Sequence, residues 1–431
     1  GQSAQIFVQT SNGFQQVQSP DIQKDANYED MEALFLDIDN DNDQDLYVVS
    51  GGSEFNERSP QLKDRVYFND GKGAFTKSVY SEIENYTISG KTVSKIDFDK
   101  DGDYDIIVGN RIKPQKYPIH EPSIIYENDN GNFRNVTGLI APEFEDFGMV
   151  NKVITTDFNN DGWEDFIVVG EWTHIGIFKN NNGTFTDIST LSGLDNETGW
   201  WFNVTETDIN NDGLKDYLVG NVGKNIKFKV SKEKPLRVYA DDFDNNGTHD
   251  VVLSKIFNDR FVPVRGKECS TMQMPFIAEK VPTFNQFAHS TLEDIYGEKI
   301  YTAYQREANQ FLSLVLINQG DETFKKVELS TMAQSMPILD AAAFDYNNDG
   351  FEDLLVVGNI YQTEVETPRL DNPYALVLQS NGRDYYDVIG PDKTGLYING
   401  DAKSVEILNH NNKTVAIVAC NNSAIEIFEL K

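Results

Sequence analysis

Cysteine, histidine, basic charge and long apolar runs are all scarce in this sequence. Cysteine occurs twice, at Cys269 and Cys420, so neither a disulfide framework nor a cysteine-based metal site organises the fold. No run approaches the roughly 18 consecutive apolar residues that a membrane-spanning helix needs. The first residues also lack the charged and apolar pattern of a leader. We therefore expect a mature protein or a fragment without a transmembrane segment, and we expect any signal peptide or lipid anchor to lie upstream of it.

The charge balance is strongly acidic. The chain has 37 basic and 69 acidic residues, which gives a formal net charge of -32. Such a charge argues against nucleic acid as a partner and makes divalent cations the natural counter-charge. Because 39% of the residues are hydrophobic and 12% are aromatic, the chain has enough apolar surface for a folded core, and the composition excludes general disorder.

Six acidic loops of the form Asp-x-(Asp/Asn)-x-(Asp/Asn), each closed by a further Asp, recur along the chain. They occupy residues 37–45, 97–105, 157–165, 208–216, 242–250 and 345–353. Each loop is followed by a short apolar run, and most are preceded by one, so each loop is predicted to connect two buried strands. The step to the fifth loop is short and the step to the sixth is long.

A second repeated element follows several loops, as in VYFNDGKGAFTKSV and IGIFKNNNGTFTDIS. Two strand-like runs flanking an Asn/Gly/Asp turn are the usual mark of a β-hairpin. One loop hairpin and one turn hairpin make a four-stranded sheet, and repeats of such sheets every roughly 40 to 60 residues indicate a β-propeller. We therefore predict an all-β fold, a seven-bladed β-propeller of four-stranded antiparallel blades, with eight blades as the alternative.

Residues 1–431 are predicted to form this single propeller. Residues 1–20 read as a hairpin that completes the last blade, in which Asn409 and Asn411 replace aspartates and no metal is expected. Residues 257–310 are not strand-like, and we expect them to form a helical or irregular insertion within blade five. An excursion from a repeat is where specific function tends to lie.

The loops have the chemistry of calcium sites. Side-chain oxygens at positions 1, 3 and 5, a backbone carbonyl at position 7 and a closing carboxylate at position 9 surround a hard cation, with a sharp turn at position 6. Glycine occupies position 6 in five loops and Asn42 in the first, and both residue types tolerate a positive φ. All-oxygen ligation favours Ca²⁺ over zinc or copper, and such complete protein ligation disfavours Mg²⁺. We predict about six structural Ca²⁺ ions.

The predicted ligand positions are, loop by loop, Asp37, Asp39, Asp41, Asp43 and Asp45; Asp97, Asp99, Asp101, Asp103 and Asp105; Asp157, Asn159, Asp161, Trp163 and Asp165; Asp208, Asn210, Asp212, Leu214 and Asp216; Asp242, Asp244, Asn246, Thr248 and Asp250; and Asp345, Asn347, Asp349, Phe351 and Asp353. The fifth loop is the weakest candidate because Asn246 replaces an aspartate.

The loops and the hairpins FNDGKGAF and FKNNNGTF resemble FG-GAP or VCBS repeats, the propeller repeats also found in the head of integrin α-subunits. More narrowly, the GWW run at 199–201 and the PVRGKECSTMQMPF stretch at 263–276 resemble the C-terminal half of large bacterial VCBS proteins with ASPIC/UnbV-type domains. That resemblance implies a secreted protein or one on the outer-membrane surface of a Gram-negative bacterium. It also implies a role in binding or assembly, in some members beside glycan-uptake machinery. It does not imply a reaction, because the motifs that the family shares are its metal loops.

Catalysis is not expected, because no histidine shows ligand or triad spacing and the carboxylates are engaged by the metal loops. The histidines are His120, His174, His249, His289 and His410. Trp200 and Trp201 are candidates to stack on sugar rings or to pack between blades, and Arg265 is a candidate to hold an acidic group or to pair with a local carboxylate.

Two hypotheses follow. The first is a non-catalytic, calcium-stabilised surface module that docks onto a protein partner in an outer-membrane assembly, possibly linked to nutrient or glycan uptake. The second is a glycan-binding or glycan-cleaving (lyase or hydrolase) module.

Overall fold

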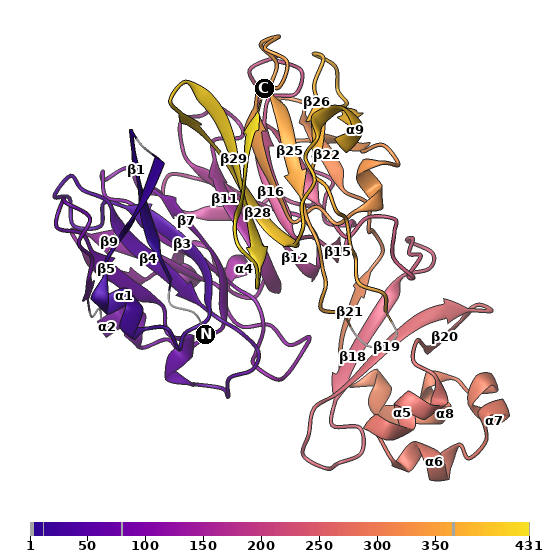
Figure 1. The fold of residues 1–431 in the computed structure, drawn as a ribbon. Coiled ribbons are helices and arrows are strands. Elements are labelled where there is room, and N and C mark those ends of the chain that lie inside the picture. The colour runs from indigo at the N-terminus through magenta and orange to yellow at the C-terminus, as the bar shows by residue number, and fades with distance from the viewer. Residues whose placement is uncertain (1–3, 12, 79–80, 364–366, 431) are drawn as a thin grey trace.

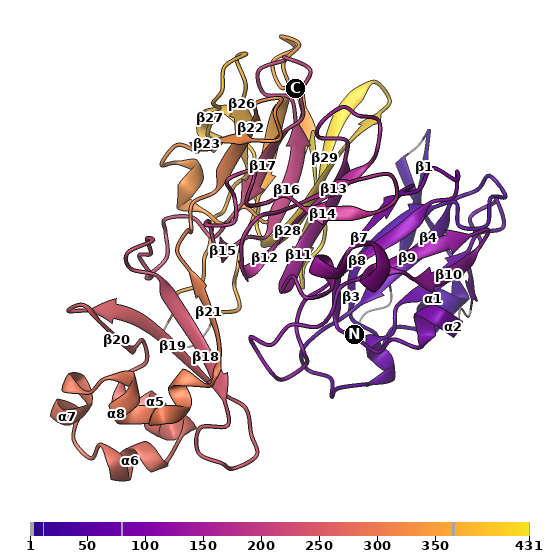
Figure 2. The same cartoon turned by 180° about the vertical axis from the view of Figure 1, so that it is seen from behind.

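The computed structural model describes residues 4–11, 13–78, 81–363 and 367–430. Antiparallel β-sheets form most of the regular secondary structure, and the fold is a β-propeller (Figures 1 and 2). An inserted unit of strands and short helices stands off from the main body in both views. Within the described residues no helix is long and apolar enough to cross a membrane.

The first three blades are consecutive in the chain, and each begins with a hairpin that carries an acidic loop. Their strands, in order, are β3 (Asp30–Leu36), β4 (Asp45–Ser50), β5 (Arg65–Phe68) and β6 (Thr76–Ser78); β7 (Gly90–Ile96), β8 (Asp105–Asn110), β9 (Ile124–Asp129) and β10 (Asn132–Asn135); and β11 (Met149–Thr156), β12 (Asp165–Thr173), β13 (Gly176–Asn180) and β14 (Phe185–Asp187). The two-residue strand β15 (Gly199–Trp200) adds to β12.

Three further sheets continue this succession. They are β16 (Asn203–Thr207), β17 (Asp216–Gly220), β22 (Leu314–Asn318) and β23 (Phe324–Glu328); β24 (Asp340–Phe344), β25 (Asp353–Val357), β26 (Leu376–Gln379) and β27 (Asp387–Ile389); and the three-stranded β28 (Asp401–His410), β29 (Lys413–Asn421) and β30 (Glu426–Leu430). The first strands of the six sheets, β3, β7, β11, β16, β24 and β28, are neighbours in this order.

The inserted unit leaves the propeller after β17 and returns at β22. It contains a sheet in the order β20-β19-β18-β21, made of β18 (Leu236–Asp241), β19 (Asp250–Phe257), β20 (Arg260–Pro263) and β21 (Tyr304–Ala308). The helices α5 (Lys267–Gln273), α6 (Phe276–Lys280), α7 (Phe284–His289) and α8 (Leu292–Tyr296) pack beside it. The remaining short helices are α1 (Pro20–Lys24), α2 (Ser81–Glu84), α3 (Thr137–Ile140), α4 (Pro142–Glu145) and α9 (Pro391–Thr394).

The prediction that the Asp242 loop belongs to a fifth blade of the propeller is therefore wrong. The helical segment within 257–310 is present, but the Asp242 loop belongs to the inserted sheet, and the insertion interrupts the fourth blade between its second and third strands. The described residues thus hold six sheets in the propeller succession, where we expected seven blades. The reason is a long-range pairing, since β17 pairs with β22 in register Leu218↔Val315.

A repeated hydrogen bond independently shows which blades are neighbours. In successive blades a polar side chain of the turn hairpin donates to the position-2 carbonyl of the acidic loop in the blade before it. The pairs are Asn128 Nδ2 to Ile38 O (3.0 Å), Asn180 Nδ2 to Phe98 O (2.9 Å), Asn318 Nδ2 to Phe158 O (2.8 Å) and Ser380 Oγ to Ile209 O (2.5 Å). The last pair joins the blade of β24 directly to that of β16, so the Asp242 loop lies outside the series.

The N-terminal hairpin does not join the last sheet as a strand. Among the described residues β1 (Ile6–Thr10) and β2 (Gly13–Val17) pair with each other alone, and residues 1–3 and 12 of the predicted closing segment lie outside the described residues. Contact with the last sheet is through side chains: Gln9 Nε2 donates to Asn409 O over 3.0 Å, and the ring of Phe14 stacks on that of His410. The last sheet therefore keeps three strands of its own.

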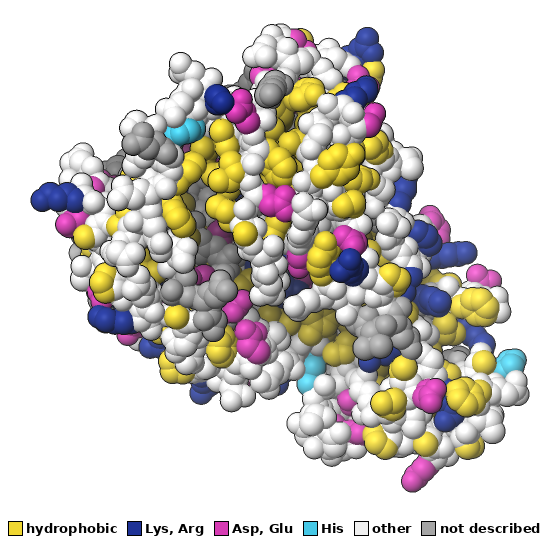
Figure 3. Space-filling model, viewed as in Figure 1, with side chains coloured by type: hydrophobic (Ala, Val, Ile, Leu, Met, Phe, Trp, Pro, Cys, Tyr) yellow, Lys and Arg dark blue, Asp and Glu magenta, His cyan; other side chains and the backbone are white. Residues whose placement is uncertain are grey.

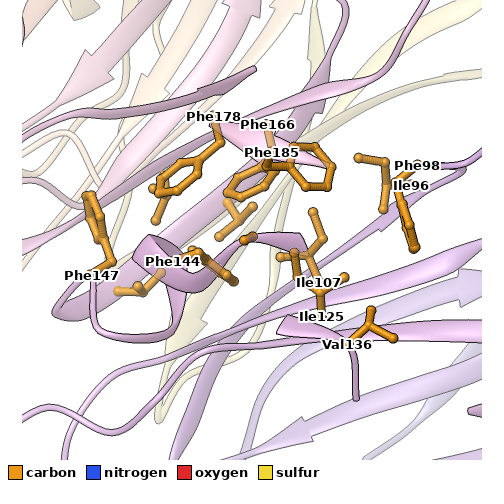
Figure 4. Packing of buried hydrophobic residues seen from close by; sticks show 14 residues of the cluster. Ile96, Phe98, Ile107, Ile125, Val136, Phe144, Phe147, Phe166, Phe178 and Phe185 are labelled. Carbon is orange, nitrogen blue, oxygen red and sulfur yellow. The ribbon is translucent and has the colours of Figure 1, made fainter. Parts of the chain in front are cut away.

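Aliphatic and aromatic side chains between neighbouring blades form the core. Figure 4 shows the cluster in which Phe166 and Phe178 stack with ring centroids 4.6 Å apart. Phe144, from the short helix α4, meets Phe166 edge-on at 5.0 Å. Because blades present apolar faces to each other, this packing holds adjacent sheets together and leaves the loops at their ends free for other roles.

Candidate functional site

The backbone of the acidic loops has the conformation that the sequence predicts. Position 6 has a positive φ in all six loops, at Asn42 (70°), Gly102 (97°), Gly162 (84°), Gly213 (84°), Gly247 (84°) and Gly350 (87°). Position 4 is also left-handed, at Asn40, Lys100, Asn160, Asn211, Asn245 and Asn348, a feature that the sequence analysis did not foresee. Asparagine is among the few residues that adopt this conformation readily, which accounts for its frequency at position 4.

Carboxylates converge in three of the loops. The groups Asp37, Asp39 and Asp45; Asp97, Asp99 and Asp101; and Asp242, Asp244 and Asp250 each place one oxygen per residue within 4.8 Å of the others. In addition, Oδ1 of Asp37 and Oδ1 of Asp97 are buried and have no hydrogen-bonding partner among the described residues. Buried, unpaired carboxylate oxygens that point to one place are costly without a cation, so these residues fit a hard divalent ion.

The loops with Asn at position 3 have the same shape. In the third loop Asp157 Oδ1 accepts from Asp161 N (3.0 Å) and Oδ2 from Gly162 N (2.8 Å). The fourth and sixth loops repeat both bonds at Asp208 and Asp345. The backbone of each of these loops therefore fixes the position of its own first aspartate.

The closing aspartate of a loop also connects two parts of its blade. Asp165, for example, accepts from Phe158 N through Oδ2 and from Asn180 N (2.7 Å) through Oδ1, and so joins the loop to the turn hairpin of the same blade. Burial, with a smaller contribution from neighbouring loop carboxylates, raises the pKa of Asp165 to about 7 and that of Asp105 to about 8. Burial likewise raises the pKa of Asp45 and Asp216 to about 6. A nearby cation would favour the charged form of each group.

The fifth loop is tied to the inserted helices. Lys299 donates through Nζ to Asn245 Oδ1 (2.6 Å) and to the carbonyl of Asp242. On the other side of the loop, Gln273 of α5 contacts Asp250 and the carbonyl of Val251. The loop therefore serves the inserted unit rather than a blade.

A cavity of about 580 Å³ lies between the propeller and the inserted unit. On the propeller side it is lined by Tyr117, Trp172 and Trp200, and by Ile360 and Leu370 beyond β25. On the inserted side the lining residues are Val238, Val251, Leu253, Val264, Arg265 and Gln273, and the connecting segment contributes Val222, Ile226 and Phe228. The indole rings of Trp172 and Trp200 meet edge-on with centroids 5.3 Å apart, and Trp172 Nε1 donates to Tyr117 Oη (2.6 Å).

The structure places the three contact residues proposed from the sequence in different environments. Trp200 and Arg265 both line the cavity although they are far apart in sequence. Trp201 does not, because it is completely buried and its Nε1 donates to Thr173 O and Glu197 O, each over 3.1 Å. Trp201 therefore packs within the fold, and its assignment as a ligand contact is corrected.

A basic segment that was not predicted from the sequence lies next to the cavity. Residues 221–237 contain five lysines and one arginine but a single acidic residue, in a chain of net charge -32. Lys227, Lys229 and Lys234 from this segment, with Lys255, line a second hollow of about 360 Å³ that shares Phe228 and Val264 with the cavity. Dark blue side chains gather at the right edge of Figure 3, beside the inserted unit. The local excess of basic residues in an otherwise acidic chain is the sequence signal that identifies the segment 221–237.

One histidine lies in a hydrogen-bonded cluster. His120 Nε2 lies 2.5 Å from Asp146 Oδ1, and its Nδ1 lies 3.3 Å from Tyr304 Oη, which accepts from Arg306 Nε (2.8 Å). His120 thus has a carboxylate and a phenol neighbour that lie far from it or out of motif spacing in the sequence. These hydrogen bonds connect the propeller to β21, and none of the residues that form them lines the cavity. Their geometry therefore fits a structural contact between the propeller and the inserted unit.

The comparisons with known proteins bear on family and fold. The FG-GAP-like repeat model matches residues 37–108 and 157–219, which hold the first four loops. No curated protein sequence matches the chain. Among the described residues, Cys269 and Cys420 are not joined by a disulfide bond.

Among solved structures, the chain is similar to a lectin from Agrocybe aegerita that recognises non-reducing terminal N-acetylglucosamine (15% identity, TM-score 0.34, covering 87% of this chain and 84% of that one). It is also similar to the V. cholerae biofilm matrix protein Bap1 (12%, TM-score 0.36, 97% and 78%) and to the Dos1 propeller (8%, TM-score 0.38, 98% and 81%). Likenesses this distant carry no argument about what this chain binds.

Proposed function

We propose that this protein, a β-propeller that belongs to the proteins with FG-GAP-like repeats, is a non-catalytic, calcium-stabilised binding module of a cell surface. The acidic loops hold Ca²⁺ and brace the blades, and the inserted unit docks onto a protein partner in an outer-membrane or surface assembly. Loops of this kind are suited to the millimolar calcium found outside cells, which supports an extracellular location.

The observation that carries this proposal is the exposed apolar surface of the inserted unit. Met272 of α5 is 80% exposed, Phe284 of α7 is 69% exposed and Tyr301 is 71% exposed. Large apolar side chains gathered on one protruding element are typical of a protein-binding surface.

Affinity capture from native outer membranes tests the proposal. The calcium-loaded chain is expected to retain a specific membrane protein, and Met272→Glu with Phe284→Glu is expected to abolish that capture. Leu139→Glu is the matched control, because Leu139 is 78% exposed on the propeller itself. Equal capture by the two sets of variants would contradict docking through the inserted unit.

A glycan ligand is the second candidate, because Trp200 lines an open cavity beside Trp172. A glycan array probed with the calcium-loaded protein separates the two candidates. Tight, selective binding that Trp200→Ala removes would favour the glycan, and an empty array would exclude it.

A further inference from the structure

The cavity between the propeller and the inserted unit has the size and setting of a small-molecule site. Its volume of about 580 Å³ lies within the usual range for organic ligands, roughly 300 to 1,000 Å³. Its walls come from sequence-distant elements, the loop after β8, β12, β15, the loop after β25 and the inserted strands β18 and β19. Such a space between two separately folded parts is a common position for a ligand.

Polar side chains are a minority of the described lining: they are Tyr117, Arg265, Gln273, Gln362, Thr363 and Thr367, beside the indole nitrogens of Trp172 and Trp200. Most of the described lining residues are aliphatic or aromatic. Tyr117 Oη already accepts from Trp172 Nε1, and Gln273 Nε2 donates to the carbonyl of Val251 (3.3 Å). Because each buried hydroxyl without a partner costs binding free energy, the walls suit an apolar body better than a free sugar.

Among the described lining residues the charged side chain is that of Arg265, so the net charge of this described lining is positive. Arg265 is exposed, lines the cavity and has no ion pair or hydrogen bond through its guanidinium among the described residues. The adjoining hollow presents Lys229, Lys234 and Lys255. In a chain of net charge -32, these cations make this region more favourable to an anion than the surface is on average.

We propose that this cavity binds an amphipathic organic anion, with its apolar body against Trp172 and Trp200 and its acidic group on Arg265. A carboxylate, sulfonate or phosphate would serve as the acidic group, since a guanidinium binds each of them through charge-assisted hydrogen bonds. The lysines of the adjoining hollow add attraction for the approaching anion. This site goes beyond the proposed docking surface, which lies on the inserted helices.

Two fluorescent probes that differ by one charge test the proposal. They are 1-anilinonaphthalene-8-sulfonate and its uncharged counterpart N-phenyl-1-naphthylamine, titrated into the full calcium-loaded chain. The anionic probe is expected to bind more tightly than the neutral one. Arg265→Gln is expected to weaken the anionic probe about tenfold and to leave the neutral probe nearly unchanged.

Two further variants make the result specific. Arg58→Gln is the matched control, since Arg58 is exposed and does not line the cavity. Val251→Trp fills the cavity from β19 and is expected to weaken both probes, while an unchanged melting temperature shows that the variant is folded. Equal losses with Arg265→Gln and Arg58→Gln, or full binding of both probes by a folded Val251→Trp, would overturn the proposal. Either failure leaves the membrane-capture result untouched, so the two proposals stand or fall separately.

Discussion

The side-chain amide of Asn318 donates a hydrogen bond over 2.8 Å to the backbone carbonyl of Phe158, in the acidic loop of the preceding blade. The same amide reaches the carbonyl of Lys215 (3.2 Å), and Asn318 Oδ1 accepts from Gly320 N (2.9 Å). One buried side chain thus joins the acidic loop of the preceding blade to the acidic loop and the turn hairpin of its own blade. The loops and the blade contacts form one network, and several measurements follow from it.

Asn318→Ala is expected to lower the free energy of unfolding by about 2 kcal/mol or more, because buried backbone groups lose their partner. Denaturant unfolding of the calcium-loaded protein measures this loss. Asn225→Ala, at an exposed position, is expected to stay within about 0.5 kcal/mol of the parent. Similar losses in both variants would show that the contact between blades does not stabilise the fold more than an exposed side chain does.

Calcium removal is expected to lower the melting temperature by roughly 10 °C or more, because ions bound only by the folded state stabilise it by mass action. Differential scanning calorimetry with and without excess chelator measures the change. Re-addition of Ca²⁺ should restore the transition, whereas equimolar Mg²⁺ should restore little of it, since Mg²⁺ dehydrates reluctantly. An identical transition in chelator would refute the structural role of the loops.

Substitution of the aspartate at position 3 is expected to reduce amide-exchange protection only in the sheet that contains the substituted loop. Asp99→Ala should reduce amide-exchange protection in β7 and β8 of the second blade. Asp244→Ala should reduce it in β18 and β19 and leave the blades protected, because the fifth loop lies in the inserted unit. Loss of protection throughout the propeller in Asp244→Ala would place the fifth loop back among the blades.

Asp64 is expected to make stability depend on pH. Its carboxylate accepts from Tyr47 Oη (2.7 Å) and Ser50 N (2.9 Å), and burial raises its pKa to about 6. Because the folded pKa exceeds the unfolded value of 3.8, the stability contributed by the protonated form is complete below about pH 4 and is lost as the pH rises through 6.

Asp64→Asn removes that dependence. Between pH 4 and pH 7 the stability of the variant relative to the parent is therefore expected to rise by about 2 kcal/mol, measured by denaturant unfolding at each pH. Asp129→Asn, at an exposed carboxylate, serves as the control. A difference between Asp64→Asn and the parent that stays constant with pH would contradict the assignment.

The sequence by itself determined the repeat, the propeller fold and the conformation of the loops. Position 6 of each loop depends on nine consecutive residues, so Gly162 or Asn42 could be assigned a positive φ without knowledge of the rest of the chain. The presence of a helical insertion followed from the local pattern of residues 257–310 in the same way.

The tertiary structure alone decided which strands share a sheet and which side chains share a cavity. The Asp242 loop has the same local pattern as the others, yet β17 pairs with β22 across the whole insertion, and this pairing removes the loop from the propeller. Likewise, Trp200 and Trp201 are adjacent in the chain, but one lines the cavity and the other is fully buried. Local sequence sets the conformation of a loop, whereas pairing and burial depend on the partners that the whole chain brings together.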